Sequence, residues 1–138
     1  MKKRILFICT HNSARSQMAE AFLKMLFPER FEAYSAGTQP GKLNPYVVRA
    51  LKETDIDISS KCTKSVDEFK GDKFDIVVTV CDQAHEACPY FPGAKDYFHR
   101  NFEDPSTFIG SEEEIMEKVR QVRDNIKEWV LETFGEYK

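Results

Sequence analysis

Apolar residues along the chain form short continuous runs and longer stripes with helical spacing. The runs at 4–9, 31–36, 74–80 and 95–99 are short and rich in aliphatic or aromatic residues, which predicts strands. Apolar residues every three or four positions predict a helix over 16–27, and Pro45 is suited to the start of another. The clearest helix follows Ser111, which forms a capping box with Glu114 ahead of an apolar stripe that reaches Trp129.

Strands that alternate with helices predict an α/β fold. Parallel strands need crossover connections, so we expect a four-stranded parallel sheet flanked by helices, in the flavodoxin-like order 2-1-3-4. The length of 138 residues suits a single domain spanning 1–138. Ligands of such sheets bind beyond the carboxyl ends of the strands, so the residues after the first strand are the first candidates for a site.

Composition narrows the function classes. Hydrophobic residues make up 41% and charged residues 31%, as in ordinary globular proteins, and the net charge of -3 argues against a nucleic-acid binder. No apolar run approaches the ~20 residues of a membrane span, and the run near the N-terminus is too short for an export signal. We therefore expect a cytoplasmic protein, where Cys9, Cys62, Cys81 and Cys88 would be catalytic, metal-binding or packing residues rather than a disulfide framework.

The loop after the first strand has the features of an oxyanion site. Cys9 ends the strand, and the following loop and helix start would turn backbone N-H groups toward a bound anion. Arg15 adds a planar fork of donors. Its positive charge and the N-terminus of the helix favour the thiolate, which predicts a lowered pKa for Cys9. A buried structural thiol is the alternative. The predicted oxyanion-binding residues are Thr10, His11, Asn12, Ser13, Ala14, Arg15 and Ser16.

The segment "CTHNSARS" resembles the phosphate-binding loop of the low-molecular-weight tyrosine phosphatase fold. Within that fold, "FICTHNSARSQMAEAF", "YSAGTQPGKLNP", "DIDIS" and "FEDPS" are similar to the thioredoxin-coupled arsenate reductases. The resemblance covers nearly the whole chain and implies Cys9 as nucleophile and Arg15 as oxyanion clamp. Two positions depart from it: His11 stands where the family usually has glycine, and Ala14 where a second cysteine is frequent.

The second and third cysteines separate the two activities of this fold, because a phosphatase needs only one. If the first and third strands are neighbours, their ends lie ~5 Å apart, within reach of a disulfide. The resemblance implies a relay: Cys9 attacks arsenate, Cys81 attacks Cys9 to release arsenite, and Cys88 attacks Cys81. Thioredoxin then reduces the resulting disulfide, although the sequence leaves glutaredoxin open as the donor. Phosphate or sulfate would compete with arsenate.

The resemblance also implies Asp104, before Pro105 in "NFEDPS", as the general acid, with Glu103 as the fallback. From local sequence alone Asp104 would be an ordinary turn residue. Ser106 stands where the phosphatases commonly have tyrosine, which favours arsenate as the substrate.

Other interpretations stay open at this stage. Cys81, His85 and Cys88 could bind zinc together with Cys62 or His99, and the protein could be a redox- or metal-sensing module or a tyrosine phosphatase. Otherwise we expect Cys62 to be a bystander and both histidines to be surface or capping residues. Asn12, Glu20 and Ser35 match part of a potassium site that some family members hold, but a further acidic ligand is not evident. We expect no metal and no bound cofactor.

Overall fold

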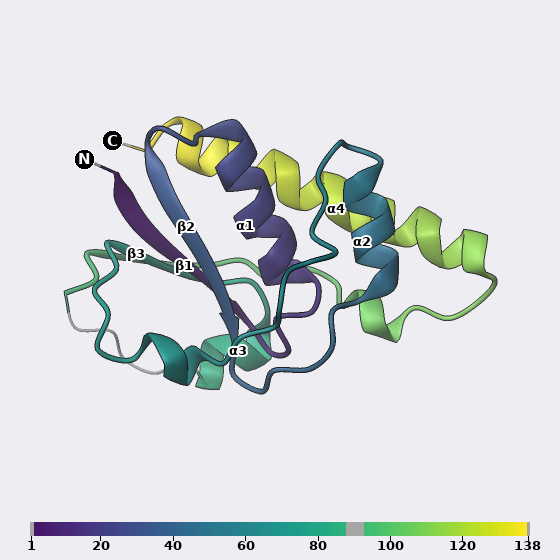
Figure 1. Cartoon of the computed structure of the whole chain (residues 1–138), viewed down its shortest axis with the longest axis horizontal. Helices are drawn as coiled ribbons and strands as arrows, with labels where there is room; N and C mark the ends of the chain where they lie inside the picture. Colours follow the sequence, from purple (N-terminus) through teal and green to yellow (C-terminus); the bar gives the residue numbers. More distant parts are fainter. Residues whose placement is uncertain (1, 88–92, 138) are drawn as a thin grey trace.

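Four parallel strands form the centre of the protein, and their order is β2-β1-β3-β4. The computed structural model describes residues 2–87 and 93–137 (Figure 1). The strands are β1 (Lys3–Cys9), β2 (Phe31–Gly37), β3 (Ile76–Thr79) and β4 (Asp96–His99). The predicted fold class and strand order are confirmed.

The described residues also form four helices and two short 3-10 turns. The helices are α1 (Arg15–Leu26), α2 (Pro45–Lys52), α3 (Asp82–Ala87) and α4 (Glu112–Gly135), and the turns are η1 (Val66–Phe69) and η2 (Pro105–Thr107). Of these, η2 and α4 follow the last strand. The predicted capping box of Ser111 and Glu114 is present at the start of α4. Among the described residues, no helix is both long and apolar enough to cross a membrane.

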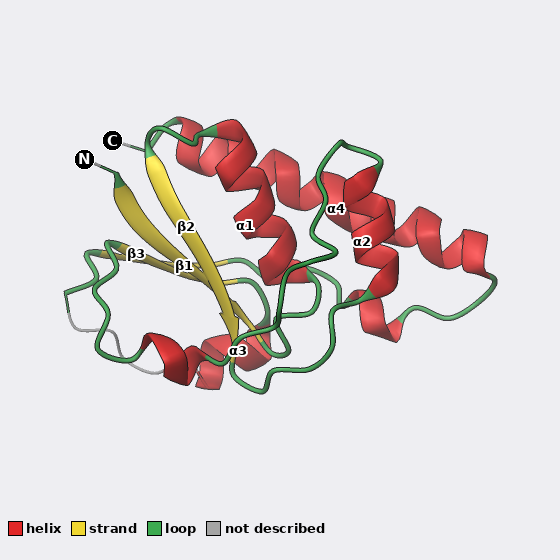
Figure 2. Cartoon of the chain, in the orientation of Figure 1, coloured by secondary structure: helices red, strands yellow, loops and turns green. Residues whose placement is uncertain are grey.

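The sheet packs differently on its two faces. Figure 2 shows α1, α2 and α4 gathered on one side, where Phe7 and Phe98 pack against Phe134 of α4. On the other face, Tyr34 of β2 packs against Phe69 and Phe74. Because side chains alternate along a strand, His99 faces away from α4, and so does Thr79, its partner in register. Thr79 and His99, at the carboxyl ends of β3 and β4, therefore lie on the face of the sheet opposite α4.

Candidate active site

The loop between β1 and α1 is built so that its amides face inward. Four of its carbonyl groups accept hydrogen bonds from backbone N-H groups of residues 38–44. The pairs are Cys9 with Thr38 at 3.1 Å, Thr10 with Gln39 at 2.7 Å, His11 with Gly41 at 3.0 Å and Ser13 with Asn44 at 2.9 Å. In a planar trans peptide the N-H group points opposite to the carbonyl, so the N-H groups that follow these carbonyls point away from residues 38–44. The loop is therefore an amide-lined cradle suited to an anion.

Gly37, the last residue of β2, allows this close approach. A Cβ atom there would lie 2.6 Å from the Thr10 carbonyl oxygen and 2.8 Å from the Asn12 amide nitrogen. Asn12 itself has a φ of 54°, a left-handed conformation that asparagine tolerates better than most residues. Only glycine fits at position 37 without moving the loop.

The Cys9 sulfur is buried and accepts two hydrogen bonds. The Asn12 backbone N-H donates to it at 3.2 Å, and the Ser16 hydroxyl lies 2.8 Å away. The Asn12 side-chain amide donates to the Ser16 oxygen at 2.7 Å, which leaves the hydroxyl proton of Ser16 free to donate to the sulfur. Asn12 and Ser16, two of the predicted oxyanion-binding residues, thus also hold the Cys9 sulfur.

The predicted lowered pKa of Cys9 is wrong. Burial raises the pKa of the thiol, because a thiolate loses its water there. Hydrogen bonds from Ser16 and Asn12 and the charge of Arg15 act in the opposite direction without offsetting the burial. The thiol form is therefore favoured until an anion or a change in exposure alters the site.

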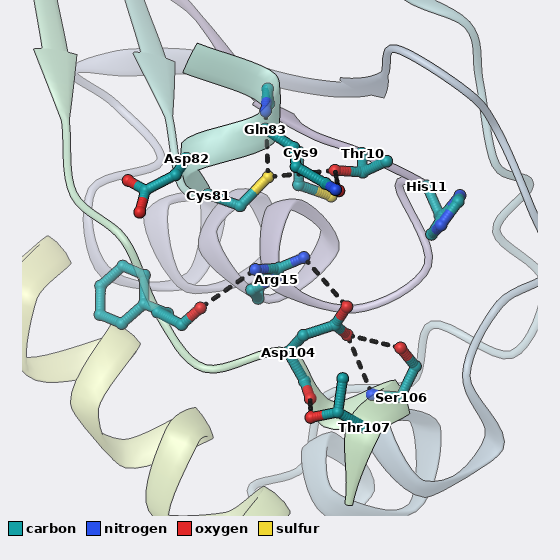
Figure 3. Close-up of polar contacts among 12 residues, drawn as sticks. Cys9, Thr10, His11, Arg15, Cys81, Asp82, Gln83, Asp104, Ser106 and Thr107 are labelled. Atoms are coloured by element: carbon teal, nitrogen blue, oxygen red, sulfur yellow. Dashed lines mark hydrogen bonds and ion pairs between the residues drawn. The ribbon is translucent and has the colours of Figure 1, made fainter. Parts of the chain in front are cut away.

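Arg15 begins α1 and is held by the segment around Asp104. Its Nη1 donates to the Phe102 carbonyl oxygen at 3.0 Å, and its Nη2 lies 3.5 Å from Asp104 Oδ2. Figure 3 shows the Arg15 side chain extended toward Asp104 beneath Cys9. Both sequence-predicted residues thus lie at one site, and Arg15 is buried.

Asp104 accepts hydrogen bonds from Ser106. Its Oδ1 accepts hydrogen bonds from the Ser106 N-H at 2.9 Å and from the Ser106 hydroxyl at 2.8 Å. Burial works to raise the pKa of this carboxyl, but the hydrogen bonds from Ser106 and the charges of Arg15 and His11 outweigh it, so the pKa is lowered. Asp104 is therefore ionised at neutral pH before an anion binds.

Cys81 lies next to the strand that carries Cys9. The Val80 N-H donates to the Ile8 carbonyl at 2.9 Å, which continues the pairing of β1 with β3 to the residue before Cys81. The Cys81 sulfur is buried and lies 3.3 Å from the Thr10 hydroxyl oxygen (Figure 3). The Ala84 N-H donates to the same sulfur at 3.4 Å. The structure therefore places Cys81 against the loop that begins at Cys9, and both thiols are free.

Cys62 is exposed, and Cys88 lies outside the described residues. Within residues 2–87 and 93–137, no group of three or more His, Cys, Asp or Glu side chains could hold a metal ion.

Glu20, named above for a possible potassium site, has partners within the protein. One carboxylate oxygen accepts from the Ser35 hydroxyl at 2.5 Å, and the other lies 2.7 Å from the Lys24 ammonium. The Lys61 ammonium lies 3.8 Å from the same oxygen as Lys24. Two lysines thus supply positive charge beside this buried carboxylate.

Sequence reasoning missed three contacts of the site. They are the Phe102 carbonyl that holds Arg15, the two hydrogen bonds from Ser106 to Asp104, and the contact of Thr10 with Cys81. An Asp followed by Pro and Ser is a signal for the second, because Asp side chains accept from the N-H two residues on. A backbone carbonyl has no sequence signal of its own.

Comparison with known proteins defines the class. The family described as low molecular weight phosphotyrosine protein phosphatase matches residues 4–136. The chain belongs to this family. Within it, the chain is 42% identical over 135 residues to an arsenate reductase of Halalkalibacterium halodurans, covering 98% of this chain and 96% of the relative.

Solved structures give the same picture. An arsenate reductase in the phosphate-binding state superposes with a TM-score of 0.82 at 29% identity and covers 99% of both chains. A thioredoxin-dependent arsenate reductase of Corynebacterium glutamicum superposes with a TM-score of 0.61 at 27% identity, covering 96% of this chain and 63% of that one. The similarity therefore extends over almost the whole of this chain.

Proposed function

We propose that this protein is an arsenate reductase that converts arsenate to arsenite through three cysteines and is reduced by thioredoxin in the cytoplasm. The observation that carries the proposal is a second buried thiol, Cys81, packed 3.3 Å from Thr10 at the start of the Cys9 loop. A phosphatase has no use for a thiol at that position. The chain's similarity to arsenate reductases, one of them described as thioredoxin-dependent, supports the same conclusion.

The first step uses the cradle. The amides of the loop and the Arg15 guanidinium hold the arsenate oxygens, the Cys9 thiol passes its proton to an oxygen of the bound arsenate, and the resulting thiolate attacks arsenic to form an S-As bond. One oxygen of arsenate leaves as water after it has gained a proton. Asp104 delivers that proton, and because Asp104 is ionised in the free protein, it must first be protonated as the negative charge of arsenate enters.

The second step forms a disulfide. The Cys81 thiolate attacks the Cys9 sulfur, the S-As bond breaks, and its electron pair stays on arsenic, which leaves as arsenite. Cys88 then attacks Cys81, which frees Cys9 and leaves a Cys81-Cys88 disulfide. Two thiols of thioredoxin reduce this disulfide and become a disulfide themselves. No resident cofactor or metal is required by these steps.

Replacement of Cys88 by serine separates the steps. The C88S variant should release one arsenite per enzyme and then stop, because the Cys9-Cys81 disulfide cannot pass its oxidation on. Arsenite is measured by quenched-flow sampling with excess arsenate, thioredoxin and thioredoxin reductase. The matched variant C62S, changed at an exposed thiol, should keep full steady-state turnover. Undiminished steady-state turnover by C88S would refute the relay.

Tyrosine phosphatase activity is the second candidate, since Cys9, Arg15 and Asp104 form the parts that phosphate ester hydrolysis needs. Because phosphate and arsenate share shape and charge, we expect some hydrolysis of phosphotyrosine. We expect this side activity to be weak. Vigorous phosphatase turnover without arsenate-dependent thioredoxin oxidation would favour this activity instead. The sensor interpretation would be favoured by zinc at one equivalent per chain in the purified protein.

A further inference from the structure

A hydrogen-bonded cluster of four side chains joins α3 to the carboxyl ends of β3 and β4. The Thr79 hydroxyl oxygen lies 2.8 Å from His99 Nδ1 and 3.3 Å from His85 Nδ1. His99 Nε2 lies 2.8 Å from Asp82 Oδ1. The two imidazole rings stack with centroids 4.2 Å apart and a tilt of 31°. None of these four side chains takes part in the steps proposed above.

The partners fix the direction of every hydrogen bond while both imidazoles are neutral. The Asp82 carboxylate can only accept, so His99 Nε2 carries the proton and His99 Nδ1 accepts from the Thr79 hydroxyl. The Thr79 oxygen then accepts from His85 Nδ1-H. Each of these donors therefore has an acceptor in a series of hydrogen bonds that runs from Asp82 through His99 and Thr79 to His85. Such a fully satisfied network favours one arrangement of the backbone that carries it.

The network holds α3 at two of its residues, Asp82 and His85. Asp82 is the first residue of α3 and His85 is the fourth, whereas Thr79 and His99 belong to strands. The Asp82 N-H also donates to the Asn101 side chain at 3.1 Å, which ties the start of α3 to the segment after β4. The helix is therefore attached to the sheet by polar contacts as well as by packing.

A helix that continued from α3 to position 88 would be incompatible with a disulfide between Cys81 and Cys88. The six residues of α3 separate these two positions in the sequence. Seven helical rises amount to about 10 Å, whereas the Cα atoms of a disulfide lie at most about 7 Å apart. We therefore infer that oxidation changes the backbone of α3 and that His85 leaves Thr79 when it does.

We propose that Asp82, His99, Thr79 and His85 form a latch that holds α3 in the dithiol form and thereby sets the thiol-disulfide equilibrium of Cys81 and Cys88. This proposal rests on the relay proposed above. Because the latch exists only with α3 intact, it stabilises the reduced form and makes the disulfide easier to reduce. His85 and His99 are positioning residues, since neither touches the substrate or the reacting sulfurs in the proposed steps.

The test is the equilibrium of the loop thiols with glutathione. The full chain carries C9S and C62S, so that only Cys81 and Cys88 remain, and the oxidised fraction is measured in buffers of graded reduced and oxidised glutathione. In the forward direction, the two thiols become a disulfide while one oxidised glutathione becomes two reduced glutathiones. We expect H85A to raise the equilibrium constant for oxidation about five-fold, the effect of one lost net hydrogen bond.

Two further variants make the result decisive. Glu86 lies on the same helix but outside the network. The equilibrium constant of E86A should stay within about two-fold of the parent value. Because this variant, like H85A, places alanine in α3, it controls for the change in helix propensity. D82N, which alters the partner of His99 with little change of shape, should move the equilibrium in the same direction as H85A. Loss of overall stability shared by both redox forms would lower the melting temperature and leave this equilibrium constant unmoved.

The latch is overturned if H85A and D82N both leave the equilibrium constant at the parent value, or if they favour the dithiol. Equal shifts for H85A and E86A would also overturn it, because they would trace to the helix alone. The measurement uses no arsenate. If the chain with C9S and C62S shows the H85A shift while the parent chain with all four cysteines makes no arsenite, the proposed function is contradicted and the latch stands.

Discussion

At the scale of single residues, burial and hydrogen bonding compete for the proton of Cys9. Ser16 and the Asn12 backbone each favour the thiolate, and burial favours the thiol and outweighs them. Asp104 shows the opposite balance, because the Ser106 hydrogen bonds and the charge of Arg15 outweigh its burial. The site is thus suited to bind an anion, whereas the reaction also requires Cys9 to lose its proton.

Ser16→Ala tests this balance directly. Removing the hydroxyl should raise the pKa of Cys9 further, because a hydrogen bond to a charged group contributes about 1.5 to 3 kcal/mol, equivalent to about 1 to 2 pH units. The measurement is the rate of alkylation by iodoacetamide against pH, in a chain with the other three cysteines changed to serine. The parent rate should still be rising above the pH at which ordinary thiols have ionised, because burial raises the pKa of Cys9.

Ser60→Ala, at an exposed turn, is the control and should leave the profile of alkylation in place. A profile for S16A that coincides with the parent, or that moves to lower pH, would contradict the assigned role of Ser16.

At the scale of elements, the site depends on how closely the end of β2 approaches the loop after β1. Four carbonyls of the loop are bonded to residues 38–44, and Gly37 packs against the loop backbone itself. The helices α2 and α4 are joined by ionic contacts of Glu53, the residue that follows α2, with Arg120 and Arg123. The contacts of residues 37–44 with the loop shape the site. The contacts of Glu53 hold α2 against α4.

Gly37→Ala should damage the cradle. The added methyl group would lie 2.6 Å from the Thr10 oxygen, so the loop must shift. We expect destabilisation of about 1 to 3 kcal/mol, typical of forced overpacking, and at least a ten-fold loss of phosphate affinity measured by calorimetry. In Gly41→Ala the nearest atom is His11 Cβ at 3.4 Å, so this control should bind phosphate normally. Equal phosphate affinities for both variants would show that the loop does not need the close approach.

Glu53 predicts a specific acid dependence of stability. Hydrogen bonds from Arg120 lower the pKa of its carboxyl to about 2, and Arg123 adds to the effect. A lowered pKa contributes stability that is present above the unfolded-state value, roughly 4.3, and is lost as pH falls toward the folded-state value. Because the side chain is 39% exposed, solvent screening limits the contribution to about 1 kcal/mol.

In urea unfolding, Glu53→Gln should therefore be less stable than the parent by about 1 kcal/mol at pH 7, and the gap should close as pH falls toward 2. Glu128→Gln, at an exposed position of α4, is the matched control and should show no comparable gap. A gap for E53Q that stays constant down to pH 2 would contradict the assigned ionic contact.

At the scale of the whole molecule, the strand order makes the chemistry possible. Because β3 pairs with β1, the residue after Val80 reaches the loop that starts at Cys9. The net charge of -3 does not attract an anion to the protein as a whole, so attraction must come from the local amides and from Arg15. In the proposed relay, oxidation then passes from Cys9 to Cys81 and on to Cys88.

The sequence predicted the long elements well because their apolar patterns extend over several turns or whole strands. It could not settle α3, whose six residues are too few to show a helical stripe, and it did not predict η1 or η2. The positions of Cys9 and Arg15 followed from the strand, loop and helix order. The raised pKa of Cys9 did not, because its cause is burial by residues distant in sequence. The network of Thr79, His85 and His99 was missed for the same reason.

The most direct test of the central claim is NADPH oxidation after arsenate is added to the protein with thioredoxin and thioredoxin reductase, compared with glutathione and glutaredoxin. We predict sustained NADPH consumption with thioredoxin, one equivalent for each arsenite formed. Arsenate that is bound but causes no NADPH consumption with either donor would contradict the three-cysteine account.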